Sequence, residues 1–179
     1  ISYVENRRFR ETNNLYSLWL AREHLEDDIV LLEADLLFQE DLMQQLIQHP
    51  ATSVAIVNRY RPPMNGTVIL AKNDIADAMV LAVDQGPGFN YLSALKTVNI
   101  YKLSRSNMRN FVIPELSRFV EAERTDQYYE AVFSDLIAQK RLQMSVLRAD
   151  SLKWAEVDTH EDLSAAEALF GRKTQETML

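Results

Sequence analysis

The sequence predicts one layered α/β domain with a largely parallel β-sheet. Along the chain, short apolar or β-branched segments alternate with longer segments whose apolar residues recur at helical spacing. The 179 residues, of which 47% are hydrophobic and 25% charged, suit a single compact domain with its own core. The sequence has no internal repeat or low-complexity segment that favours another architecture.

The strands are predicted from short runs of apolar and β-branched residues that end at polar residues, Pro or Gly. Pro62-Pro63 ends one such run, and Lys72-Asn73-Asp74 is typical of a turn between two others. The predicted strands are residues 1–4, 29–34, 53–60, 67–71, 79–83, 96–101, 144–147 and 154–157.

The helices are predicted from apolar residues three and four positions apart and from residues that favour helix ends. Thr12 is suited to cap the first helix, and Pro114 to begin a new helix inside a longer helical stretch. Thr159 with Asp162 forms an acidic variant of the capping box. The predicted helices are residues 13–25, 40–48, 104–122, 127–139 and 160–170.

The composition excludes several kinds of site and partner. Because it has no cysteine, the chain has no disulfide, no thiolate zinc site and no cysteine nucleophile. Its formal charge of -7 disfavours broad binding to nucleic acid or to an anionic membrane. No apolar run approaches the roughly 18 to 20 residues that cross a bilayer. We therefore expect a cytoplasmic protein that binds a small ligand, with no nucleic-acid or membrane partner.

The sequence also allows a prediction for each end of the chain. The chain starts at Ile1, in a predicted strand, without an initiating Met or the apolar region of a signal peptide. We expect that an N-terminal part of the domain, present in a longer parent, has been lost. The domain is predicted over residues 1–171, and the polar residues 172–179 are predicted to be a flexible tail.

Asp35 is the most informative residue of the sequence, because it follows an apolar run that we interpret as a buried strand. A carboxylate is costly to remove from water unless it meets a cation or hydrogen-bond donors. Ligands of open α/β sheets gather at the carboxyl ends of strands, where an Asp is well placed to hold a hard metal ion beside a phosphate. A simpler interpretation is that Asp35 is a turn or capping residue.

Asp158 repeats this pattern, since it also follows a predicted strand and precedes a predicted helix. If Asp35 and Asp158 face the same crevice, they form a site for Mg²⁺, which usually takes one or two carboxylates together with phosphate oxygens and water. The alternative is that Asp158 or Thr159 only caps the last helix.

Other polar residues could bind the rest of a phosphorylated ligand. The amides of Asn13 and Asn14, before an amphipathic helix, can hydrogen-bond a nucleotide, although capping explains one of the residues at this helix start. Lys96 could neutralise a phosphate, although a Lys is more often a surface residue. Tyr129 and Glu130, which follow Tyr128, could hold a cationic group, although Tyr on a helix more often packs in the core.

Several motifs, in their order and spacing, resemble those of the sugar-phosphate nucleotidyltransferase superfamily, and most of all its phosphocholine and phosphonate cytidylyltransferase branch. The motifs span nearly the whole chain. They are Asn13-Asn14-Leu15-Tyr16-Ser17-Leu18, the strand ending at Asp35, Lys96-Thr97-Val98-Asn99-Ile100-Tyr101, Tyr128-Tyr129-Glu130, Trp154-Ala155-Glu156-Val157-Asp158, Glu161-Asp162-Leu163 and Ala166-Glu167.

The resemblance implies a three-layer α/β/α domain with a mostly parallel mixed sheet. It also implies transfer of a nucleotidyl group from a nucleoside triphosphate, preferably CTP, to a small phosphate or phosphonate such as phosphocholine or aminoethylphosphonate, with release of pyrophosphate. By this similarity Asp35 and Asp158 would hold Mg²⁺ and Lys96 would act on the acceptor phosphate. Asn13 and Asn14 would lie near the nucleotide. The residues implied near the acceptor are Asn99, Tyr129 and Glu130.

The sequence departs from the family in one respect. The family carries a glycine-rich turn, an Arg and a later Lys-Pro in its first strand-helix unit, and no segment here matches them. We therefore expect this chain alone to bind nucleotide poorly and to be inactive. Some relatives are fused to another enzyme domain, so a fusion or a homodimer is expected. Two alternatives remain: a non-catalytic binding or assembly module with a degenerate transferase fold, and a metal-dependent glycosyltransferase.

Overall fold

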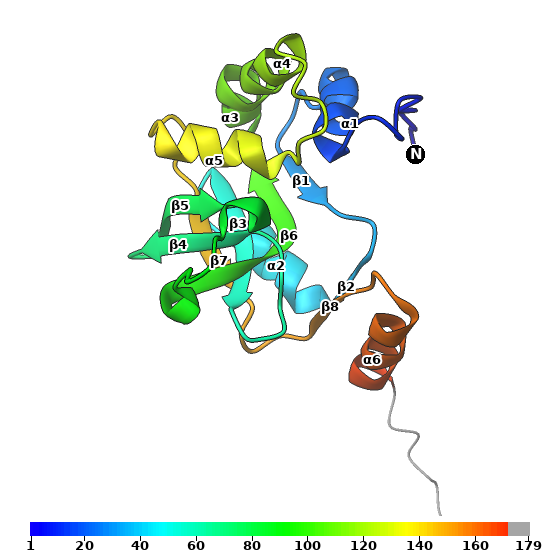
Figure 1. Ribbon diagram of the computed structural model, residues 1–179, viewed down its shortest axis with the longest axis vertical. Helices are drawn as coiled ribbons and strands as arrows, with labels where there is room; N and C mark the ends of the chain where they lie inside the picture. The colour runs from blue at the N-terminus through cyan, green and yellow to red at the C-terminus, as the bar shows by residue number, and fades with distance from the viewer. Residues whose placement is uncertain (172–179) are drawn as a thin grey trace, which may run out of the picture.

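The strands form one six-stranded sheet and one two-stranded sheet in the computed structural model, which describes residues 1–171 (Figure 1). The large sheet has the order β1-β6-β3-β7-β5-β4, and β4 also pairs with β6. Its strands are β1 (Ile29–Leu32), β3 (Ser53–Arg59), β4 (Val68–Lys72), β5 (Ile75–Val80), β6 (Ala94–Leu103) and β7 (Ser145–Arg148). The small sheet pairs β2 (Leu36–Phe38) with β8 (Trp154–Glu156).

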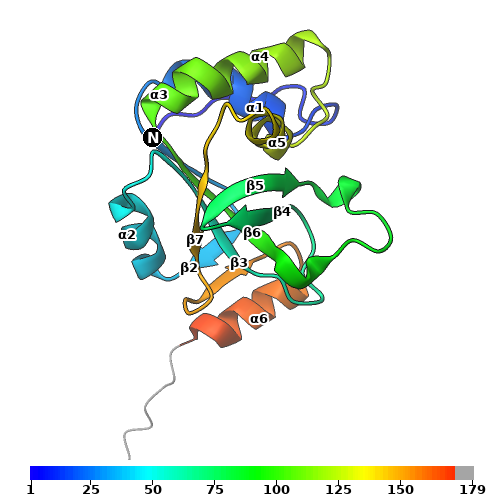
Figure 2. The ribbon, with the colours of Figure 1, turned by 90° about the vertical axis from the view of Figure 1, so that its left-hand side faces the viewer.

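The helices lie on both faces of the large sheet (Figure 2). On one side are α1 (Asn14–Leu20), α3 (Arg105–Asn107), α4 (Ile113–Glu121) and α5 (Glu130–Ala138). On the other side is α2 (Glu40–Gln48), while α6 (His160–Phe170) follows the small sheet. A π-helical segment, Met108–Val112, joins α3 to α4, so that this stretch is helical throughout, and Pro114 lies in the first turn of α4.

Two apolar clusters confirm the three layers. One joins α1, α4 and α5 to the sheet through residues such as Leu15, Phe119 and Tyr101. The other joins α2 to the opposite face through residues such as Leu46 and Ile100. Tyr101 and Ile100 are neighbours on β6 and point to opposite faces, as expected for a strand that is buried on both sides.

The prediction of a mostly parallel sheet is wrong, although the sheet is mixed. Among residues 1–171, β3 and β7 form the only parallel pair. The reason lies between residues 53 and 103, where four strands follow one another without a crossover α-helix. Parallel neighbours need a long crossover, whereas antiparallel neighbours can be joined by a tight turn such as Asn73-Asp74, where both residues have positive φ.

Several local predictions differ from the structure. Residues 1–4 form no strand and their side chains are exposed, because no described strand pairs with them. The strand before Asp35 is an edge strand and only partly buried, with Leu32 exposed. The second hairpin strand begins at Ile75 instead of residue 79, and the helix predicted from residue 127 begins at Glu130. The predicted capping box of Thr159 and Asp162 is present.

The predicted flexible tail, residues 172–179, lies outside the described residues. Within residues 1–171, no helix combines the length and the apolar character that a membrane span requires.

Candidate functional site

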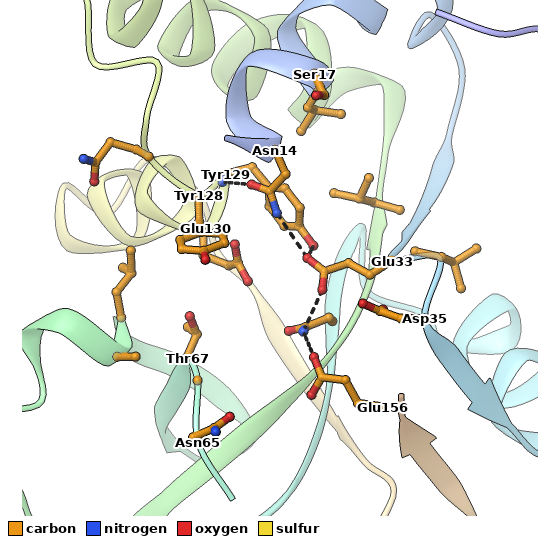
Figure 3. A pocket seen from close by; sticks show the side chains of 18 of the residues that line it. Asn14, Ser17, Glu33, Asp35, Asn65, Thr67, Tyr128, Tyr129, Glu130 and Glu156 are labelled. Carbon is orange, nitrogen blue, oxygen red and sulfur yellow. Dashed lines mark hydrogen bonds between the residues drawn. The ribbon is translucent and has the colours of Figure 1, made fainter. Parts of the chain in front are cut away.

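A cavity of about 770 Å³ brings together seven of the eight residues proposed from the sequence (Figure 3). Its walls come from α1, the β1–β2 connection, β6, the start of α5 and the end of β8. The seven are Asn14, Asp35, Lys96, Asn99, Tyr129, Glu130 and Asp158. Polar side chains from five separate segments therefore face one space.

Asp35 and Asp158 lie at the same end of the two-stranded sheet, and both line the cavity. Asp35 immediately precedes β2, and Asp158 lies two residues after β8, which pairs antiparallel with β2. The backbone N–H of Val157 donates to the carbonyl oxygen of Asp35 at 2.9 Å, which extends the pairing beyond the strands. Asp35 therefore lies in a turn between two strands and not at the end of a buried one. Thr159 caps α6, so the capping alternative applies to Thr159 and leaves the Asp158 carboxylate to the cavity.

The donor set at this place fits Mg²⁺ bound together with a phosphate. The Oδ1 atom of Asp35 is buried and accepts no hydrogen bond, which is costly unless a cation or a donor completes it. Within residues 1–171 no group of three His, Cys, Asp or Glu residues forms a metal site by itself. Mg²⁺ needs only one or two carboxylates when phosphate oxygens and water supply the remaining ligands.

Glu33 is the centre of a hydrogen-bond network beside the two aspartates. Its Oε1 accepts from Asn14 Nδ2 at 3.2 Å and from the Tyr129 hydroxyl at 2.9 Å, and its Oε2 accepts from Asn99 Nδ2 at 2.9 Å. Burial raises the pKa of the Glu33 carboxyl above its ordinary value; Asp35 adds to this rise, and the Tyr129 and Asn99 bonds oppose it. The network joins α1, β6 and the start of α5 to the β1–β2 connection.

Asn14 is therefore already engaged within the protein. Besides donating to Glu33, it accepts through Oδ1 from the backbone N–H of Tyr129 at 2.9 Å. Its neighbour Asn13 is the residue that the structure does not bring to the cavity. Asn13 is the N-cap of α1, and its side chain accepts from the backbone N–H of Asn14, a role that the sequence analysis gave to Thr12. The helix geometry explains this outcome, because the cap must precede the first helical residue.

Lys96 is buried in the cavity wall and is not a surface residue, with 3% of its area exposed. Its Nζ donates to the carbonyl oxygen of Thr97 at 2.7 Å and lies 3.7 Å from Oε2 of Glu156. Gly66 packs over its amine, and a Cβ at that position would lie 3.1 Å from Cε of Lys96. The loop before β4 thus fixes the place of this single positive charge.

Glu130 presents a second orphaned carboxylate oxygen. It is the first residue of α5, is 4% exposed, and its Oε2 has no hydrogen-bond partner. Burial raises the pKa of the Glu130 carboxyl to about 7, from an ordinary 4.5. The ring of Tyr129 packs in the core against Tyr101 and Phe133, so the cavity receives mainly its hydroxyl, whereas Tyr128 is half exposed.

Two solved structures share this fold. The CTP:phosphocholine cytidylyltransferase from Streptococcus pneumoniae matches with a TM-score of 0.69 and 18% identity, over 91% of this chain and 66% of that chain. The inositol-1-phosphate CTP transferase from T. maritima matches with a TM-score of 0.66 and 16% identity, over 92% of this chain and 64% of that chain. No protein-family model matches the chain.

A curated protein is similar to the chain in sequence. The CMP-5'-(3-aminopropyl)phosphonate synthase of Streptomyces rubellomurinus is 33% identical over 171 residues, which are 95% of this chain and 27% of that protein. The chain is thus similar to proteins of the sugar-phosphate nucleotidyltransferase superfamily, and among them to cytidylyltransferases. It spans about a quarter of this curated relative and less than two thirds of each structural neighbour named above.

Sequence reasoning missed two acidic residues of the cavity, Glu33 and Glu156. A signal was present: each precedes an aspartate by two positions, in Glu33-Ala34-Asp35 and Glu156-Val157-Asp158. Each aspartate follows a predicted strand, and the glutamate two positions earlier falls inside that predicted strand.

Proposed function

We propose that this domain performs nucleotidyl transfer from CTP to a small phosphonate or phosphate that carries a basic amine. An oxygen of the acceptor would attack the α-phosphorus, and the bond from that phosphorus to the β-phosphate would break to release pyrophosphate. The observation that carries the proposal is that Asp35 and Asp158 share one cavity with the buried Lys96. The names of the similar proteins, among them a phosphocholine cytidylyltransferase and a CMP-5'-(3-aminopropyl)phosphonate synthase, support the same reaction.

The acidic and basic residues of the cavity would bind different parts of the two substrates. Asp35 and Asp158 would hold Mg²⁺, which when bound neutralises the charge of the triphosphate. Lys96 is the one Lys or Arg among the described residues that line the cavity, and it would bind and orient the acceptor's phosphate or phosphonate group. Positioning and charge neutralisation are the main contributions that a protein makes to phosphoryl-type transfer.

The acceptor's ammonium group would lie at Glu130. The buried Oε2 of this carboxylate is a hydrogen-bond acceptor without a partner, and an ammonium N–H donor would complete it. Tyr128 is the half-exposed aromatic ring at the cavity and would contact the same group.

The reaction is tested by following pyrophosphate release with CTP, Mg²⁺ and a set of aminoalkylphosphonates, aminoalkyl phosphates and phosphocholine. The assay uses the 179-residue chain and, where its gene encodes a longer protein, the full-length product. Asp35→Asn and Asp158→Asn should each lower the rate by roughly 100-fold or more. Asp77→Asn, an exposed carboxylate outside the cavity, is the matched control. Pyrophosphate release that survives both cavity variants, or release with no acceptor specificity, contradicts the proposal.

The acceptor site is tested separately with Glu130→Gln. This variant should raise the KM for an aminoalkylphosphonate and leave unchanged the KM for an alkylphosphonate of equal length without the amine. An equal change for both acceptors would place the amine elsewhere. Hydrolysis of nucleotide sugars in place of nucleoside triphosphates would indicate a glycosyltransferase instead.

A further inference from the structure

We infer that Asn99 is a positioning residue that holds the two acidic segments, Glu33–Asp35 and Glu156–Asp158, at the correct separation for the metal. The inference rests on the proposed function, because it concerns the same pair of aspartates. Asn99 donates one hydrogen bond to Glu33 Oε2 at 2.9 Å and one to Glu156 Oε1 at 3.0 Å. A single amide therefore joins segments that lie more than a hundred residues apart in the chain.

The orientation of the Asn99 amide is fixed by its own neighbours. Its Nδ2 carries two N–H groups, and both glutamates are acceptors. Its Oδ1 lies 2.9 Å from the hydroxyl oxygen of Thr97, whose single hydrogen also has the carbonyl oxygen of Thr67 within reach at 3.0 Å. The opposite orientation would turn the amide oxygen toward two carboxylates, so only the observed one donates to both glutamates.

The cavity needs such a connection because it concentrates negative charge. Glu33, Asp35, Glu156 and Asp158 line the same space, together with one Lys, and like charges at short distance repel strongly where water is excluded. The hydrogen bond from Val157 to Asp35 joins the two segments through the main chain. Asn99 joins them through their glutamates, two residues before each aspartate.

The backbone at Asn99 has an unusual conformation that suits this positioning role. Its φ is +59°, in the left-handed region that Asn tolerates better than most residues. It lies where β6 shifts register against β3, between the Val57–Thr97 and Ala55–Tyr101 pairs. Such bulges redirect a side chain that a regular strand would place elsewhere. The positive φ also decides which substitutions suit a test. Asn99→Gly accepts this backbone conformation without strain, and Asn99→Asp keeps the size of the side chain.

The test measures metal affinity and not only activity. Mn²⁺ replaces Mg²⁺, and its binding in the presence of CTP is followed by electron paramagnetic resonance, with thermal midpoints measured in parallel. Asn99→Gly should weaken Mn²⁺ binding by about tenfold, as loss of a residue that orients metal ligands typically does. Asn99→Asp should weaken it further, since it adds a third carboxylate between two others. The matched control is Asn73→Gly, which has a similar positive φ in the β4–β5 turn, outside the cavity, and should leave the affinity unchanged.

The outcomes separate this inference from the proposed function. If Asp35→Asn does not alter Mn²⁺ binding, the proposed function fails. If Asp35→Asn abolishes binding while both Asn99 variants keep wild-type affinity, the positioning role alone is overturned. A lower thermal midpoint with unchanged Mn²⁺ affinity also overturns it, because that is the result of a merely structural role. Should the Asn99 variants not fold, Thr97→Val removes the hydroxyl that orients the amide and should weaken Mn²⁺ binding several-fold; unchanged affinity in this variant counts against the inference.

Discussion

Val157 donates its backbone N–H to the carbonyl oxygen of Asp35 at 2.9 Å, just beyond the last pair of the two-stranded sheet. This bond ties the turn before β2 to the segment after β8, and each segment carries one of the two aspartates at the cavity. The small sheet thus acts as the scaffold of the candidate metal site.

Removing that donor should weaken the metal site without changing any carboxylate. Val157→Pro deletes the N–H, because proline has no backbone amide hydrogen. We expect several-fold weaker Mn²⁺ binding in the presence of CTP, measured by electron paramagnetic resonance. Val157→Ala keeps the N–H and should bind as wild type. Equal affinities in the two variants would show that this bond does not hold the aspartates.

Lys96 should matter for the reaction far more than for the fold. Lys96→Met keeps the apolar length of the side chain but removes the charge, and we expect pyrophosphate release to fall by about 10² to 10³-fold. Lys72→Met, which removes an exposed Lys at the end of β4, should leave the rate unchanged. A Lys96→Met protein with near wild-type kcat/KM for the phosphorylated acceptor would contradict the role assigned to Lys96.

Gly66 should be sensitive to the smallest possible enlargement. Its φ is +96°, and an added Cβ would lie 3.1 Å from Cε and 3.2 Å from Nζ of Lys96. Gly66→Ala therefore strains the loop and displaces the Lys96 amine, so kcat/KM for the acceptor should fall. Gly86→Ala is the matched control, because a Cβ there meets nothing within 4 Å. Steady-state kinetics on both variants test this, and equal losses would contradict it.

Glu130 should make acceptor binding depend on pH. Burial raises the pKa of its carboxyl to about 7, and only the ionised carboxylate attracts an ammonium group strongly. The KM for an amine-bearing acceptor should fall as the pH rises through about 7, while the amine itself stays protonated. Glu130→Gln should flatten this dependence. A pH profile that is the same in wild type and variant would show that another group titrates.

The same residue should reduce stability at higher pH. The folded protein keeps the Glu130 proton up to about pH 7, whereas the unfolded chain releases it near 4.5. Stability is therefore greatest below pH 4.5 as far as this group is concerned, and it falls between 4.5 and 7, by about 3 kcal/mol in total. Glu130→Gln should remove this slope and be more stable than wild type at pH 8, as measured by urea unfolding across the pH range. A variant that is less stable at pH 8 would contradict this.

Local patterns predicted most of the individual elements. The helix over residues 40–48 and the capping box at Thr159 are both confirmed, because caps, Pro and apolar spacing act over a few residues. Strand direction was predicted wrongly, because it depends on how distant segments pair. The same contrast holds for the candidate site. Asp35 and Asp158 were proposed from their neighbours in sequence, whereas Glu33 was not.

By itself, the sequence determined the type of most elements and the likeness to a family, and it predicted seven residues that line the cavity. Only the tertiary structure decided that Asn13 caps a helix while Asn14 reaches the cavity, and that Asn99 connects Glu33 with Glu156. The physical reason is the distance along the chain over which each interaction acts. Capping and amphipathic spacing are contained in a few consecutive residues, whereas burial, hydrogen-bond partners and charge at the cavity arise from segments that meet only when the sheets have formed.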